Sequence, residues 1–185
     1  LPRQGKIHLG EKVIAKSGKE FPQARDYFVL PDQLLEDSDF QAALEALGED
    51  PSKPKTLPIW FPSDVIAVNL QSSADYYGSS RGLICRSLDG ITCRYVDAAT
   101  GELKENPCSM RSGCEHYEKG DCHWIHRLRF FLPDSHGTGV WQIDTTSKNS
   151  RPTLATEMKI IKGMMGGRLA GIDLLLQLKP QEFSL

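Results

Sequence analysis

The chain has 185 residues, of which 39% are hydrophobic and 25% are charged, as in an ordinary globular domain rather than a disordered chain. The formal net charge of −2 and the pI near 6.2 argue against autonomous binding to DNA, which needs a broad positive field. No run of about 18 apolar residues and no apolar signal core occurs, which favours a soluble cytoplasmic protein. We expect a single domain over residues 1–185. Its start at Leu1 leaves open that the chain is a fragment of a longer one.

The first third of the chain predicts two strands and then a helix. Residues 6–30 alternate loosely in hydrophobicity and break at SGKEFP, as two strands joined by a turn do. Residues 38–47 predict a short helix, because Ser38 and Gln41 fit a capping box and a Gly and a Pro follow as a stop. The apolar face of this helix would consist of Phe40, Ala43, Leu44 and Leu47.

The rest of the chain is dominated by strand signals. Residues 59–70 are expected to be extended, and RGLICRSLDGITCRYV predicts a hairpin with an Asp-Gly tip. Two further strands are expected around a Gly-rich turn in residues 128–145, and a final strand at IDLLLQLKP. A second helix is predicted over residues 153–165, with Ser150 as a cap and an apolar stripe of Leu154, Met158, Ile161 and Met165. The fold class is therefore α+β, mainly antiparallel strands with two short helices and a cysteine loop.

That loop, NPCSMRSGCEHYEKGDCHW at residues 106–124, has three of the five cysteines and almost no apolar side chain before its last residue. Such a segment buries too little surface to order itself. Zinc takes four soft or nitrogen ligands in a tetrahedron and orders small segments of this kind. We predict one structural zinc ion held by Cys108, Cys114, Cys122 and one cysteine of the hairpin, with free thiols or disulfides as the alternatives.

The fourth ligand depends on the tip of the hairpin. A two-residue loop pairs position 85 with 94 and sends Cys85 and Cys93 to opposite faces, whereas a three-residue loop pairs 85 with 93 and places both thiols together. His116 and His123 are alternatives, although a lone loop histidine is more often solvated. His123 also follows Cys122 directly, and adjacent residues seldom both reach one ion.

Catalytic motifs are weak in this sequence. The run DSHG at residues 134–137 is typical of a turn, since the members of a catalytic triad converge from separate elements. The stretch GMMGGRLAG lacks the Lys-Ser/Thr of a phosphate-binding loop. A zinc-dependent hydrolase would need an open coordination position, and a zinc-ribbon nucleic-acid-binding module would need a basic surface, so both are alternatives rather than the leading hypothesis.

Several segments, in order, resemble the phage-type recombination directionality factors of large serine integrases, a zinc-containing family often labelled metal-binding protein. The matching stretches are GKIHLGEKV, FPQARDYFVLP, SRGLICRSLDG, PCSMRSGCEHYEKGDC, LPDSHGTGVWQIDTTSKNS and GRLAGIDLLLQLKP. They cover nearly the whole chain.

The resemblance implies a phage- or prophage-encoded protein with no reaction of its own. It would bind a large serine integrase on attachment-site DNA in the bacterial cytoplasm, and would switch it from integration to excision. The resemblance also implies a zinc-binding hairpin and loop at about residues 83–124, with Cys85, Cys108, Cys114 and Cys122 as ligands. Cys93 is then an extra thiol and the alternative fourth ligand. Within the loop, Tyr117 and Trp124 are the side chains best able to anchor a partner.

Overall fold

The computed structural model describes residues 1–185 except 16–17, 19, 79–81, 98, 109–113 and 180–185. Strands dominate it. They are β1 (Arg3–Ile14), β2 (Glu20–Val29), β3 (Thr56–Ile59), β4 (Leu70–Gly78), β5 (Gly82–Ser87), β6 (Thr92–Val96), β7 (Leu103–Pro107), β8 (Cys122–Phe130), β9 (Val140–Thr145) and β10 (Leu174–Gln177). The helices are α1 (Asp32–Leu35), α2 (Ser38–Ala46), α3 (Ile66–Asn69), α4 (Glu115–Glu118) and α5 (Ser150–Met164). The prediction of an α+β fold with mainly antiparallel strands is confirmed.

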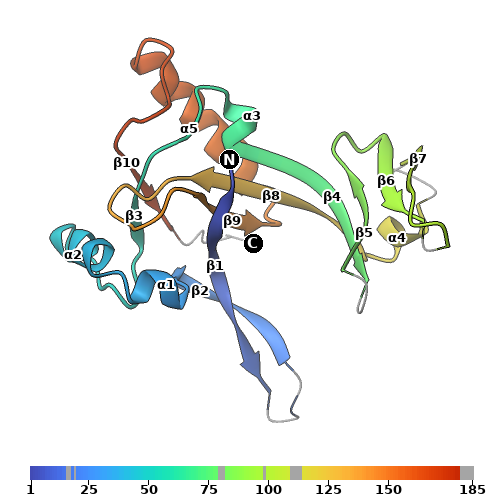
Figure 1. Ribbon diagram of the computed structural model, residues 1–185, viewed down its shortest axis with the longest axis horizontal. Helices are drawn as coiled ribbons and strands as arrows, with labels where there is room; N and C mark the ends of the chain where they lie inside the picture. The colour runs from blue at the N-terminus through green and yellow to red at the C-terminus, as the bar shows by residue number, and fades with distance from the viewer. Residues whose placement is uncertain (16–17, 19, 79–81, 98, 109–113, 180–185) are drawn as a thin grey trace, which may run out of the picture.

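Eight of the strands form one sheet in the order β2-β1-β9-β8-β4-β5-β6-β7, and β10 pairs with β3 in a second, two-stranded sheet. Within the large sheet β1 and β9 run parallel, and the other neighbours run antiparallel. Strands β4 and β8 are long and join the middle of the molecule to the end where β5, β6, β7 and α4 gather (Figure 1).

One face of the central strands carries the hydrophobic core. Register places Leu70 opposite Leu128 and Ile143 opposite both Leu128 and Ile7, so these side chains share a face. Helix α5 packs Met158 against this core, and α2 contributes Phe40 and Leu44. The opposite face of the same strands is polar. It carries Lys6 beside Gln142, and Arg127 beside Asp144.

The two predicted helices exist, but their N-terminal caps differ from the predicted ones. Asp37, not Ser38, caps α2: its carboxylate accepts a hydrogen bond from the backbone N–H of Phe40 at 3.2 Å. Gln41 donates instead to the carbonyl of Leu34 at 2.8 Å. Helix α5 begins at Ser150 and its N-cap is Asn149. An aspartate one position earlier competes successfully because a carboxylate is a strong acceptor near a helix N-terminus.

Most of the predicted strands are present, and one predicted extended segment is partly helical. The first two strands, the strands on either side of the Gly-rich turn, the DSHG turn and the final strand are all confirmed. The expectation of extended chain over 59–70 is wrong in part, because residues 66–69 form α3. Strands β4 and β7 were not anticipated, since their sequences are too polar to alternate clearly. Part of the predicted first turn and residues 109–113 of the cysteine loop lie outside the described residues.

Candidate functional site

Three of the five cysteines lie on strands β5, β6 and β8, and Cys108 and Cys114 lie between β7 and α4 at the same end of the sheet. Tyr76 of β4 pairs with Cys85 on one side and with Cys122 on the other, which aligns these three residues across neighbouring strands. Cys93 pairs with Ser87, two residues beyond Cys85 on the same face of β5. Residues that pair directly or diagonally in this way share a face, so the fold brings the hairpin thiols and the β8 thiol together.

The hairpin tip is wider than either predicted form. Strand β5 ends at Ser87 and β6 begins at Thr92, and Cys85 pairs with Tyr95. Both predicted pairings of Cys85, with residue 94 and with residue 93, are therefore wrong. The wider loop forms because the Asp89 carboxylate accepts from the backbone N–H groups of Ile91 at 2.8 Å and Thr92 at 2.9 Å. These bonds satisfy backbone donors that a two-residue turn would have paired across the strands.

The thiol groups are sheltered and interact with one another. All five are free thiols, and Cys108 and Cys122 are buried. Burial raises the pKa of Cys85 to about 12, helped by a hydrogen bond to Cys93 and by the nearby Cys108 and Cys122. Burial, together with the nearby Cys114 and Cys108, also raises the pKa of Cys122 to about 11. Burial likewise raises the pKa of Cys108.

The donor chemistry fits zinc, because several thiols in a sheltered place supply soft ligands whose ionisation a cation would favour. Among the described residues, however, no three His, Cys, Asp or Glu side chains form a group arranged to hold a metal ion. The structure therefore shows converging thiols and does not show the predicted zinc-ordered loop. Cys93 packs against Cys108 and Cys122, and it helps to raise the pKa of Cys85 and of Cys108.

The two histidines of the loop have different positions. The ring of His116 stacks on Tyr76 with centroids 4.2 Å apart, next to the Cys85–Cys122 row. His123 follows Cys122 on β8 and pairs with Asp75, and successive strand residues project to opposite faces. Of these two side chains, His116 is thus the one on the thiol side of the sheet.

Next to the thiols lies a cleft of about 1210 Å³, between α4 and the start of α5. Tyr117 and Trp124, the two predicted partner contacts, both line it, and Tyr117 is 40% exposed. Lys148 and Arg151 also line it, and none of the described lining residues is a carboxylate. The cleft therefore combines aromatic surface with positive charge.

A polar group that sequence reasoning missed lies in this cleft. The Ser72 hydroxyl hydrogen-bonds to Nδ1 of His126 at 2.8 Å and accepts from Nε of Arg151 at 2.9 Å. Because the Arg151 N–H donates to Ser72, the hydroxyl proton is free to point to His126. Burial, with Arg151 and Arg127 nearby, lowers the pKa of His126 and keeps its imidazole neutral. These contacts order Arg151. Ser72 lies 54 positions before His126 and 79 positions before Arg151, so no local sequence signal links these residues.

None of the described helices is long and apolar enough to cross a membrane. No curated protein and no solved structure matches the chain significantly. A family model described as Gp3-like, recombination directionality factor-like, matches residues 4–185. That range includes the thiol cluster, the cleft and both sheets. The chain therefore belongs to the recombination directionality factor-like family, and its role is in DNA recombination.

Proposed function

We propose that this protein binds a large serine integrase and switches it from integration to excision, without catalysing a reaction itself. The family match over residues 4–185 is the observation that carries this proposal. A directionality factor needs no active site of its own. It acts by binding one arrangement of the DNA-bound integrase more tightly, and a preference of about 3 kcal/mol changes a population ratio roughly 100-fold.

The cleft between α4 and α5 is the proposed contact for the integrase. Its aromatic wall contains Tyr117 and Trp124, side chains that often anchor protein interfaces. Its lining also includes Lys148 and Arg151, without a carboxylate among the described lining residues. This combination fits a segment of the integrase that has apolar side chains flanked by acidic ones.

We further propose that a structural zinc ion orders the thiol end of the sheet. Cys108, Cys114 and Cys122 would be three of its ligands, and Cys85 the fourth, with Cys93 as the alternative. The convergence and burial of these thiols support the proposal. The ion would crosslink the hairpin, the loop and β8, and would so hold Tyr117 at the edge of the cleft.

The test is an in vitro recombination assay with the integrase encoded beside this protein. Added protein should promote recombination between the left and right hybrid attachment sites and suppress it between the phage and host sites. If neither reaction changes at a several-fold excess of folded, zinc-loaded protein, the proposed switching function is wrong.

A matched pair of variants tests the cleft. Tyr117→Ala should weaken integrase binding and shift the dose response of the switch to higher protein concentration, on the order of tenfold. Phe21→Ala is the control, because Phe21 is 44% exposed, close to the 40% of Tyr117, and lies on β2 away from the cleft. If the two variants have equal effects, the cleft is not the integrase contact.

A further inference from the structure

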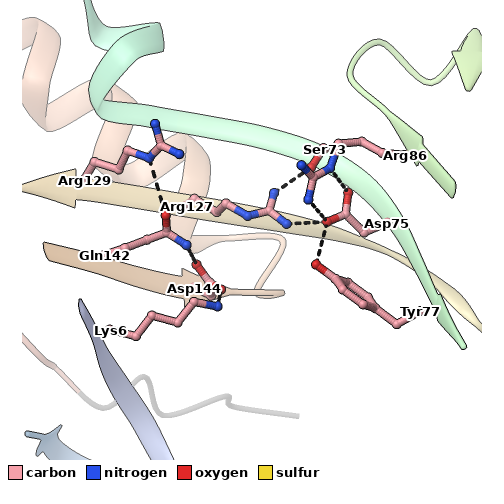
Figure 2. A network of polar contacts seen from close by, with 9 residues as sticks. All are labelled: Lys6, Ser73, Asp75, Tyr77, Arg86, Arg127, Arg129, Gln142 and Asp144. Atoms are coloured by element: carbon pink, nitrogen blue, oxygen red, sulfur yellow. Dashed lines mark hydrogen bonds and ion pairs between the residues drawn. The ribbon is translucent and has the colours of Figure 1, made fainter. Parts of the chain in front are cut away.

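The polar face of the large sheet has a recess of about 200 Å³ that is lined by cationic side chains. Arg3 and Lys6 come from β1, Arg86 from β5, and Arg127 and Arg129 from β8. None of its described lining residues is an aspartate or a glutamate. Figure 2 shows most of these side chains gathered over the sheet around the Asp75 and Asp144 carboxylates.

The carboxylates behind the recess balance only part of its charge. The buried Asp75 carboxylate accepts from Nε of Arg86 at 2.9 Å and from Nη2 of Arg86 at 2.8 Å, and Arg127 donates to the same group (Figure 2). Asp144 accepts from Lys6 at 2.5 Å. Five cations thus face two carboxylates, which leaves an excess of about three positive charges in a chain whose net charge is −2.

Two of the five cations have donors to spare. The Arg129 guanidinium makes one long hydrogen bond, from Nε to Oε1 of Gln142 at 3.4 Å. Over the part of the chain that the structure describes, neither Arg129 nor Arg3 has an ion pair with a carboxylate. Arginine donors in a fixed fork match the oxygen geometry of phosphate.

We propose that this recess binds phosphate groups of the DNA backbone. The cations extend over strands β1, β9, β8, β4 and β5, four steps of about 4.8 Å, or roughly 19 Å. One phosphate would occupy only part of that length. A DNA strand presents a charge about every 3.4 Å along the helix axis, so it supplies several anions to the same array.

This contact is compatible with a protein that has little affinity for DNA alone. Neutralising about three phosphates gives a salt slope near −2.7, so affinity should fall about 40-fold between 50 and 200 mM salt. The recess becomes effective when another protein holds the DNA nearby, because tethering raises the local concentration of phosphate. The inference concerns the isolated chain and does not depend on the proposed integrase contact.

The experiment measures binding of the full chain to a short fluorescent DNA duplex by anisotropy at several salt concentrations. Wild-type protein should bind weakly at about 50 mM salt, with the slope given above. The double variant Arg3→Gln/Arg129→Gln should lose most of this binding and lower the slope by about two. The control is Lys159→Gln/Lys179→Gln, which changes the net charge equally at two exposed positions away from the recess. It should bind like wild type.

Four outcomes would overturn the inference. The first is no low-salt binding by wild type, and the second is equal loss in the test and control variants. The third is a thermal shift of wild type with inorganic phosphate while no duplex binds, which would assign the recess to a free anion. If the double variant keeps its DNA binding but loses binding to the integrase, the recess contacts an acidic protein surface and the DNA assignment is wrong.

Discussion

Asp75 is the residue on which the polar face of the sheet depends. Its side chain is fully buried, and burial alone would raise its pKa. Hydrogen bonds with Arg86 and Ser73 and the charge of Arg127 oppose burial and lower the pKa from 3.8 to about 2. The carboxylate is therefore ionised at neutral pH, and it joins β4 to both β5 and β8 through Arg86 and Arg127.

Replacing this carboxylate should be costly. Asp75→Asn leaves Arg127, which is 10% exposed, without its counter-charge, and should lower the free energy of unfolding by about 3–5 kcal/mol. Glu105→Gln is the control, because the Glu105–Arg94 pair is more than half exposed on both sides and should contribute less than about 1 kcal/mol. Urea unfolding of both variants measures the difference. A similar small loss in each would contradict the role assigned to Asp75.

The same group predicts a dependence of stability on acid pH. Because the folded pKa of Asp75 is about 2 and the ordinary value is 3.8, the unfolded chain takes up a proton first as pH falls. This contribution is fully present above about pH 4 and is lost between pH 4 and pH 2, on the order of 2 kcal/mol. Asp37, whose pKa is also lowered, should act in the same direction. Urea midpoints measured from pH 2 to pH 6 would show the loss, and a flat profile would contradict it.

At the scale of single elements, α2 depends on its cap. Asp37 accepts from the backbone N–H of Phe40, and it also accepts from the backbone N–H of His136 at 2.7 Å and from the ring Nδ1 at 3.0 Å. One carboxylate thus joins the start of the helix to the turn between β8 and β9. The hydrogen bond to Asp37 raises the pKa of His136.

Two neighbouring substitutions separate this cap from the predicted one. Asp37→Ala should lower the free energy of unfolding by about 2 kcal/mol, because it removes the cap and the contact to His136. Ser38→Ala should change it by less than about 0.5 kcal/mol, as is usual for a surface position. Thermal unfolding of both proteins is the measurement. A larger effect at Ser38 would restore the predicted capping box.

The thiol end of the sheet is the element that the proposed zinc ion would order. Elemental analysis of purified, chelator-washed protein should find about one zinc ion per chain. Cys114→Ser should lower the melting temperature by several degrees and weaken zinc retention, because one ligand is lost. Less than about 0.2 zinc per chain, with all five thiols reacting freely in the native state, would end the zinc proposal.

The hairpin cysteines offer a matched comparison for the fourth ligand. Cys85→Ser should reduce zinc retention as strongly as Cys114→Ser if Cys85 is the ligand. Cys93→Ser should then leave the zinc content unchanged. The reverse result would assign the fourth position to Cys93, which packs against Cys108 and Cys122.

At the scale of the whole molecule, two cores of unequal size share one sheet. The large core includes residues from both sheets and from α1, α2 and α5. The small core consists of Ala74, Cys108 and Cys122, with Tyr76, Cys93 and Trp124 packed against it. So little apolar surface stabilises the thiol end only weakly, and strands β4 and β8 connect it to the large core (Figure 1).

Removal of zinc by a chelator should therefore destabilise the thiol end of the sheet more than the large core. Removing zinc should speed amide hydrogen exchange over about residues 82–122 and leave β1, β9 and α5 protected, because the large core does not depend on the thiols. Exchange followed by mass spectrometry with and without chelator is the measurement. Uniform loss of protection would show that the two cores unfold together.

Much of the local structure could be predicted from the sequence. Helical spacing and stop signals located α2 and α5 to within a few residues, and alternation located the first two strands and the last. The polar composition and the three cysteines of residues 106–124 marked the segment for which zinc is proposed, and this proposal remains a prediction. These features depend on neighbours a few positions apart, so the sequence records them directly.

Tertiary structure alone decided the rest. Register at the hairpin followed from side-chain hydrogen bonds of Asp89, and it placed Cys85 and Cys93 on one face by a pairing that no loop rule anticipated. Pairing of β1 with β9 joins segments more than 130 positions apart and completes the basic recess. Ser72, His126 and Arg151 likewise meet only in the folded chain. Such contacts depend on which strands become neighbours, and the packing of the whole sheet sets that order rather than any local pattern.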